Sequence, residues 1–255
     1  MGRFATTVEL YAQFRPPYPP EFFRTVAGRL KLSKEDALLD LGTGPGLLAL
    51  GFAPYAGSVT GVDPEPAMLT AARRAAARAG LAFTSIEGKA EDLPEDLGRF
   101  DLVTIGRALH WMDHSALGPL FKRLVAPDGV IAICASASAR EGRNAWLDDY
   151  NAGRRAWSNT QLWSQSRQGE RQRDLAAALD GSGFHTAETI EVETTHEVRA
   201  ADLARRVLTF SSSSPAALGE RADAMLADIE TRLLPFSRDG LLTEVVVSTA
   251  QIARR

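Results

Sequence analysis

The chain has 255 residues, of which 45% are hydrophobic and 24% charged, and this balance suits a globular protein with a sizeable core. Its formal net charge of -3, with arginines spread along the sequence, disfavours a nucleic-acid partner, because such partners select a basic excess or a basic stripe. A single cysteine excludes an internal disulfide and a cysteine-rich metal site, so we expect no metal. The sequence has no long apolar run and no secretory signal, which predicts a cytoplasmic protein without a membrane partner.

The first 35 residues are expected to form an N-terminal strap followed by a helix. Four prolines, Pro16, Pro17, Pro19 and Pro20, argue against a helix before about residue 20. Pro20 can itself occupy a first helical turn, and the amphipathic stretch 21–30 follows it. A helix is therefore predicted over residues 21–30.

Between residues 37 and 135 the sequence alternates regularly between apolar strands and helices. Near-continuous apolar strands separated by helices indicate a parallel sheet covered on both faces, and right-handed crossovers make it doubly wound. The predicted strands are 37–41, 58–63, 82–86, 100–105 and 129–134, and the predicted helices are 47–52, 64–79 and 115–125.

The second half of the chain is less regular. Residues 140–180 are polar and helical in pattern, and helices are also expected over 200–210 and 216–234. Two further strands are predicted at 188–198 and 241–252. No internal repeat or long linker is evident, so a single domain over residues 1–255 is expected.

A glycine-rich loop follows the first strand of the alternating region. Gly42, Gly44 and Gly46 allow the backbone to turn sharply and approach a ligand closely. A dinucleotide site would need a third glycine at the position of Leu47, in the pattern G-x-G-x-x-G. Instead, Asp40 precedes the loop, and its carboxylate can accept a hydrogen bond from the ammonium group of S-adenosylmethionine.

The ends of the next two strands also carry polar groups. Asp63 can hold two ribose hydroxyls, and Glu91 with Asp92 could accept from an adenine amino group. Ligands of open α/β sheets lie outside the carboxyl ends of the strands. Three successive strand ends therefore suit one adenosine-containing ligand.

These motifs together resemble the class I S-adenosylmethionine-dependent methyltransferases. The resemblance covers residues 37–135 and includes the segments 39–46, 62–64, 90–94, 100–103, 108–111 and 124–129. The segment Tyr11–Pro19 resembles the type 11 subgroup, which is related to trans-aconitate methyltransferases. The sequence departs from the family at Lys89, where an aspartate is common, and at Asp128, where a glycine is common.

The resemblance implies a doubly wound, seven-stranded, mostly parallel sheet of the Rossmann-like α/β type, with a helical cap from insertions in the C-terminal half. Residues 36–135 would be the cofactor-binding core and residues 136–255 the substrate-side insertions and last two strands. S-adenosylmethionine is the implied cofactor and S-adenosylhomocysteine the product. The implied cofactor-binding residues are Tyr11, Arg15, Asp40, Gly42, Thr43, Gly44, Gly46, Asp63, Pro64, Ala90, Glu91, Asp92 and Arg107.

Methyl transfer from a sulfonium mainly requires the acceptor to be aligned with the methyl group. An acceptor hydroxyl, acid or amine must also be deprotonated. His110 is our candidate base, and the alternative is that His110 and Trp111 only line the pocket. Tyr18, His110, Trp111 and Trp146 are the candidate substrate-binding residues. Arg15 could bind either the methionine carboxylate or a substrate carboxylate.

The sequence thus predicts a methyltransferase with a small-molecule acceptor and no nucleic-acid partner. A non-catalytic S-adenosylmethionine-binding regulator would carry the same motifs and is kept as the alternative. An NAD-dependent oxidoreductase is disfavoured by Leu47, and a methyltransferase for exocyclic amines of nucleic acids is disfavoured by residues 105–108. The sequence assigns neither an oligomeric state nor the acceptor atom.

Overall fold

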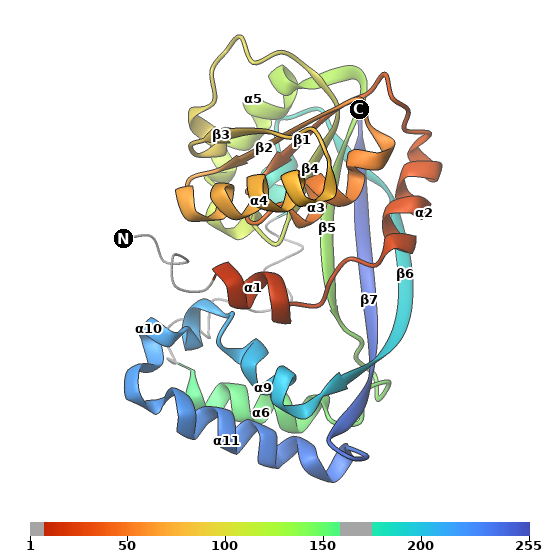
Figure 1. Cartoon of the computed structure of the whole chain (residues 1–255). Coiled ribbons are helices and arrows are strands. Elements are labelled where there is room, and N and C mark those ends of the chain that lie inside the picture. Colours follow the sequence, from red (N-terminus) through yellow and green to blue (C-terminus); the bar gives the residue numbers. More distant parts are fainter. Residues whose placement is uncertain (1–7, 159–174) are drawn as a thin grey trace. The chain divides into compact units, whose positions relative to one another are not determined.

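The computed structural model describes residues 8–158 and 175–255. Its strands form one seven-stranded sheet in the order β3-β2-β1-β4-β5-β7-β6 (Figure 1). Within the described ranges, every helix is too short or too polar to cross a membrane. The strands are β1 (Ala37–Leu41), β2 (Ser58–Asp63), β3 (Thr84–Glu87), β4 (Phe100–Gly106), β5 (Val125–Ser138), β6 (His185–Arg199) and β7 (Leu241–Arg254).

The sheet confirms the predicted doubly wound, mostly parallel arrangement. β1 lies at the centre and pairs in parallel with β2 and β4, while β3 and β5 extend the sheet in parallel on either side. The strand order reverses between β1 and β4, and sheets of this type bind their ligands outside the carboxyl ends of the strands at such a point.

β7 lies between β5 and β6 and runs opposite to both (Figure 1). At one end of the β5–β7 pair the Ala139 N–H donates to the Val245 carbonyl at 2.7 Å. At the other end, a guanidinium nitrogen of Arg255 donates to the Val125 carbonyl at 3.3 Å. The last two strands therefore form the antiparallel edge that the resemblance implied.

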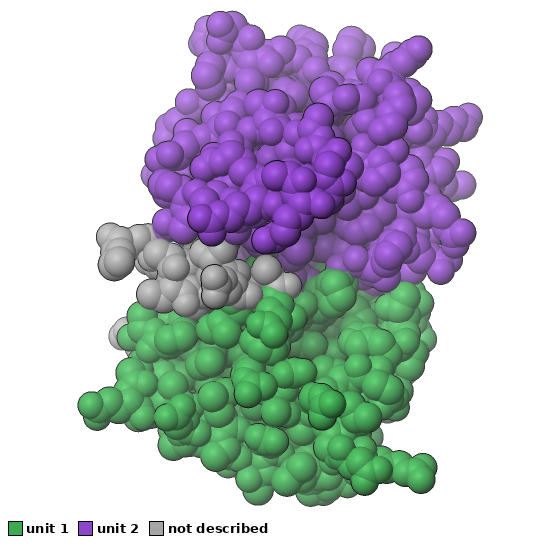
Figure 2. Space-filling view, viewed as in Figure 1, with its two compact units in different colours: residues 1–17, 136–167, 193–247 green, residues 18–135, 168–192, 248–255 purple. Residues whose placement is uncertain are grey.

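The chain divides into two compact units (Figure 2). Unit 1 comprises residues 1–17, 136–167 and 193–247, and unit 2 comprises residues 18–135, 168–192 and 248–255. Both units combine segments that are distant in sequence.

Alternate strand residues of unit 2 face two different cores, because successive side chains of a strand point to opposite faces. Leu39 and Ile105 belong to the core that α5 covers, and Leu38 and Leu102 to the core that α2 and α3 cover. The sheet is therefore packed on both faces, as its apolar strands predict. The helices of this unit are α2 (Pro20–Leu30), α3 (Leu47–Phe52), α4 (Pro66–Ala79) and α5 (His114–Leu124).

Unit 1 has a separate core formed by its helices. Tyr150, Val207, Ile229 and Leu242 are among the buried side chains of this core. They come from helices predicted in the C-terminal half and from β7, so helices formed by the C-terminal insertions are confirmed. The helices are α1 (Val8–Phe14), α6 (Leu147–Trp157), α9 (Ala200–Val207), α10 (Pro215–Leu218) and α11 (Ala222–Leu233).

The structure differs from the expected elements in four places. α1 forms before the prolines, because proline restricts only the residues beside it and a helix can end upstream of it. β5 and β6 are longer than expected and continue into polar sequence. The helix expected over 216–234 is interrupted at Gly219, whose φ of 56° is left-handed.

Candidate functional site

The glycine loop predicted to hold the cofactor lies between β1 and α3. Gly42, Gly44 and Gly46 all have positive φ angles, of 68°, 55° and 87°. Residues with a side chain rarely adopt such angles, so glycine is required for the path of the loop. The Thr43 N–H donates to the Val62 carbonyl at 2.8 Å and ties the loop to the end of β2.

The surroundings of Gly42 and Gly44 differ. A methyl group added at Gly42 would lie 2.4 Å from the Ala108 side chain, which follows β4. The loops after β1 and β4 therefore touch at this point, and the contact requires glycine. A methyl group added at Gly44 would meet nothing within 4 Å, so this glycine faces open space into which a ligand can fit.

Asp40, at the base of the loop, is 1% exposed. Its carboxylate oxygens accept hydrogen bonds from the hydroxyls of Thr43 and Thr104, each at 2.7 Å. Burial raises the pKa of Asp40 to about 6, and the two threonine hydroxyls oppose that rise. The carboxylate thus fixes the loop to β4 and places a negative charge below it at neutral pH.

Asp63, at the end of β2, is 8% exposed. It accepts hydrogen bonds from the N–H groups of Gly44 at 2.8 Å and Glu65 at 2.9 Å. Burial raises the pKa of Asp63, and these two hydrogen bonds oppose the rise. Because a carboxylate offers about four acceptor positions, two remain for hydroxyl groups of a ligand. Pro64, which follows it, is exposed.

The loop after β3 presents the predicted adenine contacts. Ala90 is buried, Glu91 is half-buried and Asp92 is exposed. The Glu91 carboxylate accepts a hydrogen bond from the Asp113 N–H, which links this loop to the start of α5. Asp113 caps α5 by accepting a hydrogen bond from the Ser115 N–H at 3.0 Å.

The loop after β4 carries the candidate base. His110 is exposed, and its ring centroid lies 4.8 Å from that of Trp111, which is 47% exposed. Arg107 has a left-handed φ of 60°, and its guanidinium carbon lies 5.1 Å from the ring centroid of Tyr18. Arg107, Tyr18, His110 and Trp111 are thus all part of unit 2 together with the glycine loop.

Three predicted site residues belong to unit 1. The Arg15 guanidinium carbon lies 5.1 Å from the ring centroid of Tyr11 and 3.9 Å from that of Phe210. Trp146 is 2% exposed, and its indole N–H donates to the Thr243 carbonyl at 3.0 Å. Trp163, another tryptophan of the insertion, lies outside the described residues.

Two residues of the site were not singled out from the sequence. Thr104 anchors Asp40, and Ala108 packs against Gly42. Thr104 is the one hydroxyl within the apolar strand that runs from Phe100 to Gly106, and that position is the signal that could have identified it. Ala108 carries no chemical signal, because its role is a contact with a loop far away in the sequence.

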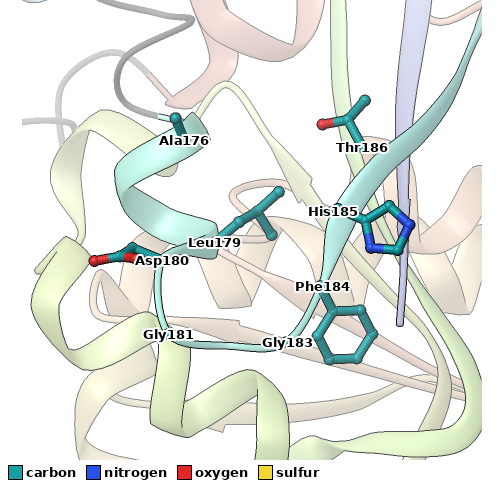
Figure 3. Close-up of a pocket in the computed structure, with 8 residues that line it drawn as sticks. All are labelled: Ala176, Leu179, Asp180, Gly181, Gly183, Phe184, His185 and Thr186. Carbon is teal, nitrogen blue, oxygen red and sulfur yellow. The ribbon is translucent and has the colours of Figure 1, made fainter.

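A separate open hollow of about 450 Å³ is found elsewhere in unit 2 (Figure 3). His185 begins β6 and Phe184 immediately precedes it, and the Asp180 side chain points away from both. None of the predicted site residues lines this hollow, so it is distinct from the cofactor loop. Its lining residues are Ala176, Leu179, Asp180, Gly181, Gly183, Phe184, His185 and Thr186.

Comparison with known proteins agrees with this geometry. Residues 38–129 match the methyltransferase domain family. An uncharacterized methyltransferase of Mycobacterium tuberculosis is 31% identical over 144 residues, which are 56% of this chain and 55% of that protein. The chain therefore spans about half the length of this relative and of two other curated relatives that it matches equally well.

Solved structures share the fold over nearly the whole chain. A putative type II methyltransferase from Anaeromyxobacter dehalogenans is 20% identical with a TM-score of 0.62, covering 94% of this chain and 97% of that one. A methyltransferase from Thiobacillus denitrificans, in complex with S-adenosylhomocysteine, is 16% identical with a TM-score of 0.56, covering 100% and 98%. The predicted class I methyltransferase fold is confirmed, and the matched segment holds the glycine loop, Asp63 and the loops after β3 and β4.

Proposed function

We propose that this protein transfers a methyl group from S-adenosylmethionine to a small-molecule acceptor. The observation that carries the proposal is the hydrogen bond from the Gly44 N–H to Asp63, within the segment that matches the methyltransferase domain. It joins the glycine loop after β1 to the carboxylate after β2. These are the two features that the sequence assigned to the methionine and ribose parts of one ligand.

The residues present fit this cofactor. Gly44 faces open space, Asp63 keeps two acceptor positions, and Asp40 supplies a buried negative charge below the loop. The negative charge favours a ligand that carries an ammonium and a sulfonium group. The loop around Ala90 and Glu91 is proposed to contact the adenine, with Asp92 at its exposed edge. When bound, S-adenosylmethionine supplies a methyl group that is already activated by a positively charged sulfur.

The protein's own contribution is to align the acceptor and accept a proton. His110 is exposed on the loop after β4, and histidine is a common general base, so it is our proposed base for an acceptor hydroxyl, acid or amine. Trp111 beside it offers an exposed apolar surface for an acceptor. Tyr18 lies below Arg107 and is proposed to complete this wall.

A small acceptor is favoured over a macromolecular one. The net charge of -3 and the dispersed arginines do not form a basic nucleic-acid surface. The segment Tyr11–Pro19 supports the finer proposal of kinship with trans-aconitate methyltransferases. A small soluble acceptor also fits the proposed cytoplasmic location.

The competing function is a regulator that binds S-adenosylmethionine without turnover. The test is incubation of the protein with S-adenosylmethionine and a fractionated pool of small metabolites, with S-adenosylhomocysteine measured by mass spectrometry. The proposal expects S-adenosylhomocysteine to accumulate only with fractions that contain an acceptor, and to fall strongly in an Asp63→Ala control. Binding of S-adenosylmethionine without accumulation in any fraction would favour the regulator.

A further inference from the structure

The Glu91 side chain joins the loop after β3 to the start of α5. Glu91 lies in the short 3-10 turn Ala90–Asp92, and its carboxylate accepts a hydrogen bond from the Asp113 N–H. Asp113 is the residue that caps α5, and it follows Trp111 by two positions. The residue pattern suggested the acidic pair only as acceptors for adenine, so this contact is a role that the sequence did not indicate.

Glu91 completes the N-terminal cap of α5 from a distant part of the chain. In a common type of cap, the capping side chain accepts a hydrogen bond from an N–H of the first turn, and a glutamate three residues later accepts one from the capping residue's own N–H. Asp113 makes the first of these bonds, with the Ser115 N–H at 3.0 Å. The position of the glutamate is occupied by Ala116, which has no acceptor in its side chain. Glu91 therefore takes its place, and its negative charge suits the positive end of the helix dipole.

The loop after β3 is itself attached at both ends. The Gly88 N–H donates to the Asp63 backbone carbonyl at 3.2 Å, which attaches the start of the loop to the end of β2. A guanidinium nitrogen of Arg123 donates to the Leu93 carbonyl at 3.1 Å, which attaches the other end to the last turn of α5. Ala90 and Leu93 are also buried in the core that α5 covers. Glu91 thus projects from a well-anchored loop.

The segment 107–113, between β4 and α5, carries the proposed base and the proposed acceptor wall. Within it, the N–H groups of Trp111 and Met112 donate to carbonyls three residues earlier, at 2.9 and 3.2 Å. These local bonds shape the turn, whereas the bond from the Asp113 N–H to Glu91 attaches it to the loop after β3. The place of the proposed base relative to the cofactor loops therefore depends in part on this contact.

We propose that Glu91 is a positioning residue for methyl transfer, because it holds the loop of His110 and Trp111 in place relative to the cofactor loops. This proposal rests on the proposed function, since it concerns the alignment of the acceptor in that reaction. Alignment is the main demand of methyl transfer, so a small displacement of the loop should lower turnover without an equal loss of cofactor affinity. Glu91 then serves the protein, and Asp92 is left to accept from the adenine amino group.

The test compares four variants with the wild type. Glu91→Ala removes the acceptor, and Glu91→Gln keeps an oxygen that can accept from the Asp113 N–H. Glu91→Ala combined with Ala116→Glu places a glutamate within α5, where it can cap the helix without joining the two loops. Glu95→Ala alters an exposed carboxylate of the same segment and is the matched control. Each variant is measured for S-adenosylhomocysteine affinity by calorimetry, for amide hydrogen exchange by NMR, for thermal melting, and for turnover with the metabolite fraction that supports S-adenosylhomocysteine formation.

We expect Glu91→Ala to lower turnover about tenfold, while the affinity for S-adenosylhomocysteine changes by less than about twofold. The amides of residues 111–113 should exchange about tenfold faster, because the segment loses its hydrogen bond to the loop after β3. Glu91→Gln should recover turnover to within about threefold of the wild type. Adding Ala116→Glu to Glu91→Ala should slow the exchange of the Asp113 amide and restore the melting temperature, but turnover should stay low. Glu95→Ala should behave like the wild type.

Full turnover by Glu91→Ala, or unchanged amide exchange at residues 111–113 in that variant, would overturn the proposal. A loss of turnover matched by an equal loss of S-adenosylhomocysteine affinity would overturn it too, because Glu91 would then be an adenine contact. Recovery of turnover by Ala116→Glu would reduce Glu91 to a helix cap and would also contradict the proposal. Failure of the wild type to form S-adenosylhomocysteine with any metabolite fraction would instead contradict the proposed function, whereas the exchange measurement tests the loop contact without any acceptor.

Discussion

At the residue scale, two buried carboxylates organise the candidate cofactor site. Asp40 joins the glycine loop to β4 through Thr43 and Thr104, and Asp63 joins it to β2 through the Gly44 N–H. Burial raises the pKa of both carboxylates. Each carboxylate therefore stabilises the loop, and its protonation state can change when a cationic ligand binds.

The raised pKa of Asp40 predicts a pH dependence of cofactor binding. A cationic ligand favours the ionised carboxylate, so protonation of Asp40 below its pKa of about 6 should oppose binding. The affinity for S-adenosylmethionine should fall about tenfold between pH 7 and pH 5, because about nine-tenths of Asp40 is then protonated. Calorimetry across this range measures the effect, and Asp40→Asn should have a flat profile over the same range.

The stability of the unliganded protein should rise as the pH is lowered, whereas the affinity for S-adenosylmethionine should fall. The folded-state pKa of Asp40 lies above its ordinary value of 3.8, so the native state binds more protons between these two values. The contribution of Asp40 to stability is then fully present below about pH 4 and is lost as the pH rises through about 6.

For the binding experiment, an affinity for S-adenosylmethionine that stays constant from pH 5 to pH 7 would contradict the assigned role of Asp40.

His110 makes a second residue-scale prediction. If it accepts the acceptor's proton, His110→Ala should lower turnover about 100-fold or more at saturating acceptor, without changing affinity for S-adenosylmethionine. Stopped-time assays of S-adenosylhomocysteine formation measure this, with His185→Ala as the control for an exposed histidine. Full turnover by His110→Ala would leave the histidine as a wall of the pocket only.

At the element scale, the glycine loop is shaped by its neighbour after β4. Gly42 has both a left-handed φ and a contact with Ala108, whereas Gly44 has a left-handed φ and open space. The two glycines are thus a matched pair. One serves the packing of the fold, and the other is proposed to face the ligand.

Alanine substitutions should separate these two roles. Both Gly42→Ala and Gly44→Ala force an alanine into a left-handed backbone conformation. Only Gly42→Ala also overpacks the contact with Ala108, which should lower the unfolding free energy by about 1–3 kcal/mol more. Gly44→Ala should remain the more stable variant while losing affinity for S-adenosylmethionine. Chemical denaturation and calorimetry measure the two effects. Equal destabilisation by both variants would show that the contact with Ala108 is not significant.

The sequence predicted this loop well because its signal is local. Glycine spacing, a preceding carboxylate and a following helix all lie within residues 40–52. Contacts between distant segments carried no such signal. Ala108, which packs against Gly42, was missed for this reason, and so was the group of Arg154 and Phe210 around Arg15, whose members come from three separate stretches of the chain.

At the scale of the whole molecule, each compact unit has its own core and its own buried polar cluster. Unit 2 holds Asp40 and Asp63 at the ends of parallel strands. Unit 1 holds the ion pair of Arg206 and Glu244, which are 5% and 0% exposed. Burial raises the pKa of Glu244, but the hydrogen bonds and charge of Arg206 outweigh it, so the pKa is lowered overall.

The buried ion pair predicts that substitutions of Arg206 and Glu244 have non-additive effects on the unfolding free energy. Arg206→Met leaves Glu244 buried without its main partner and should lower the unfolding free energy by about 3–5 kcal/mol. Adding Glu244→Leu should recover much of this loss, because no buried charge then remains. Urea denaturation of the single and double variants measures the coupling. Strictly additive losses would contradict a buried, mutually dependent pair.

The central claim is that the loop from Asp40 to Gly46, with Asp63, binds S-adenosylmethionine. The most direct test is isothermal titration calorimetry of the wild type and Asp63→Ala with S-adenosylmethionine, with NAD as the comparison ligand. We predict binding of S-adenosylmethionine, about 10- to 100-fold weaker in Asp63→Ala because two hydrogen bonds to a charged group are lost, and no comparable binding of NAD. Tighter binding of NAD, or an affinity for S-adenosylmethionine that changes less than twofold in Asp63→Ala, would contradict the account.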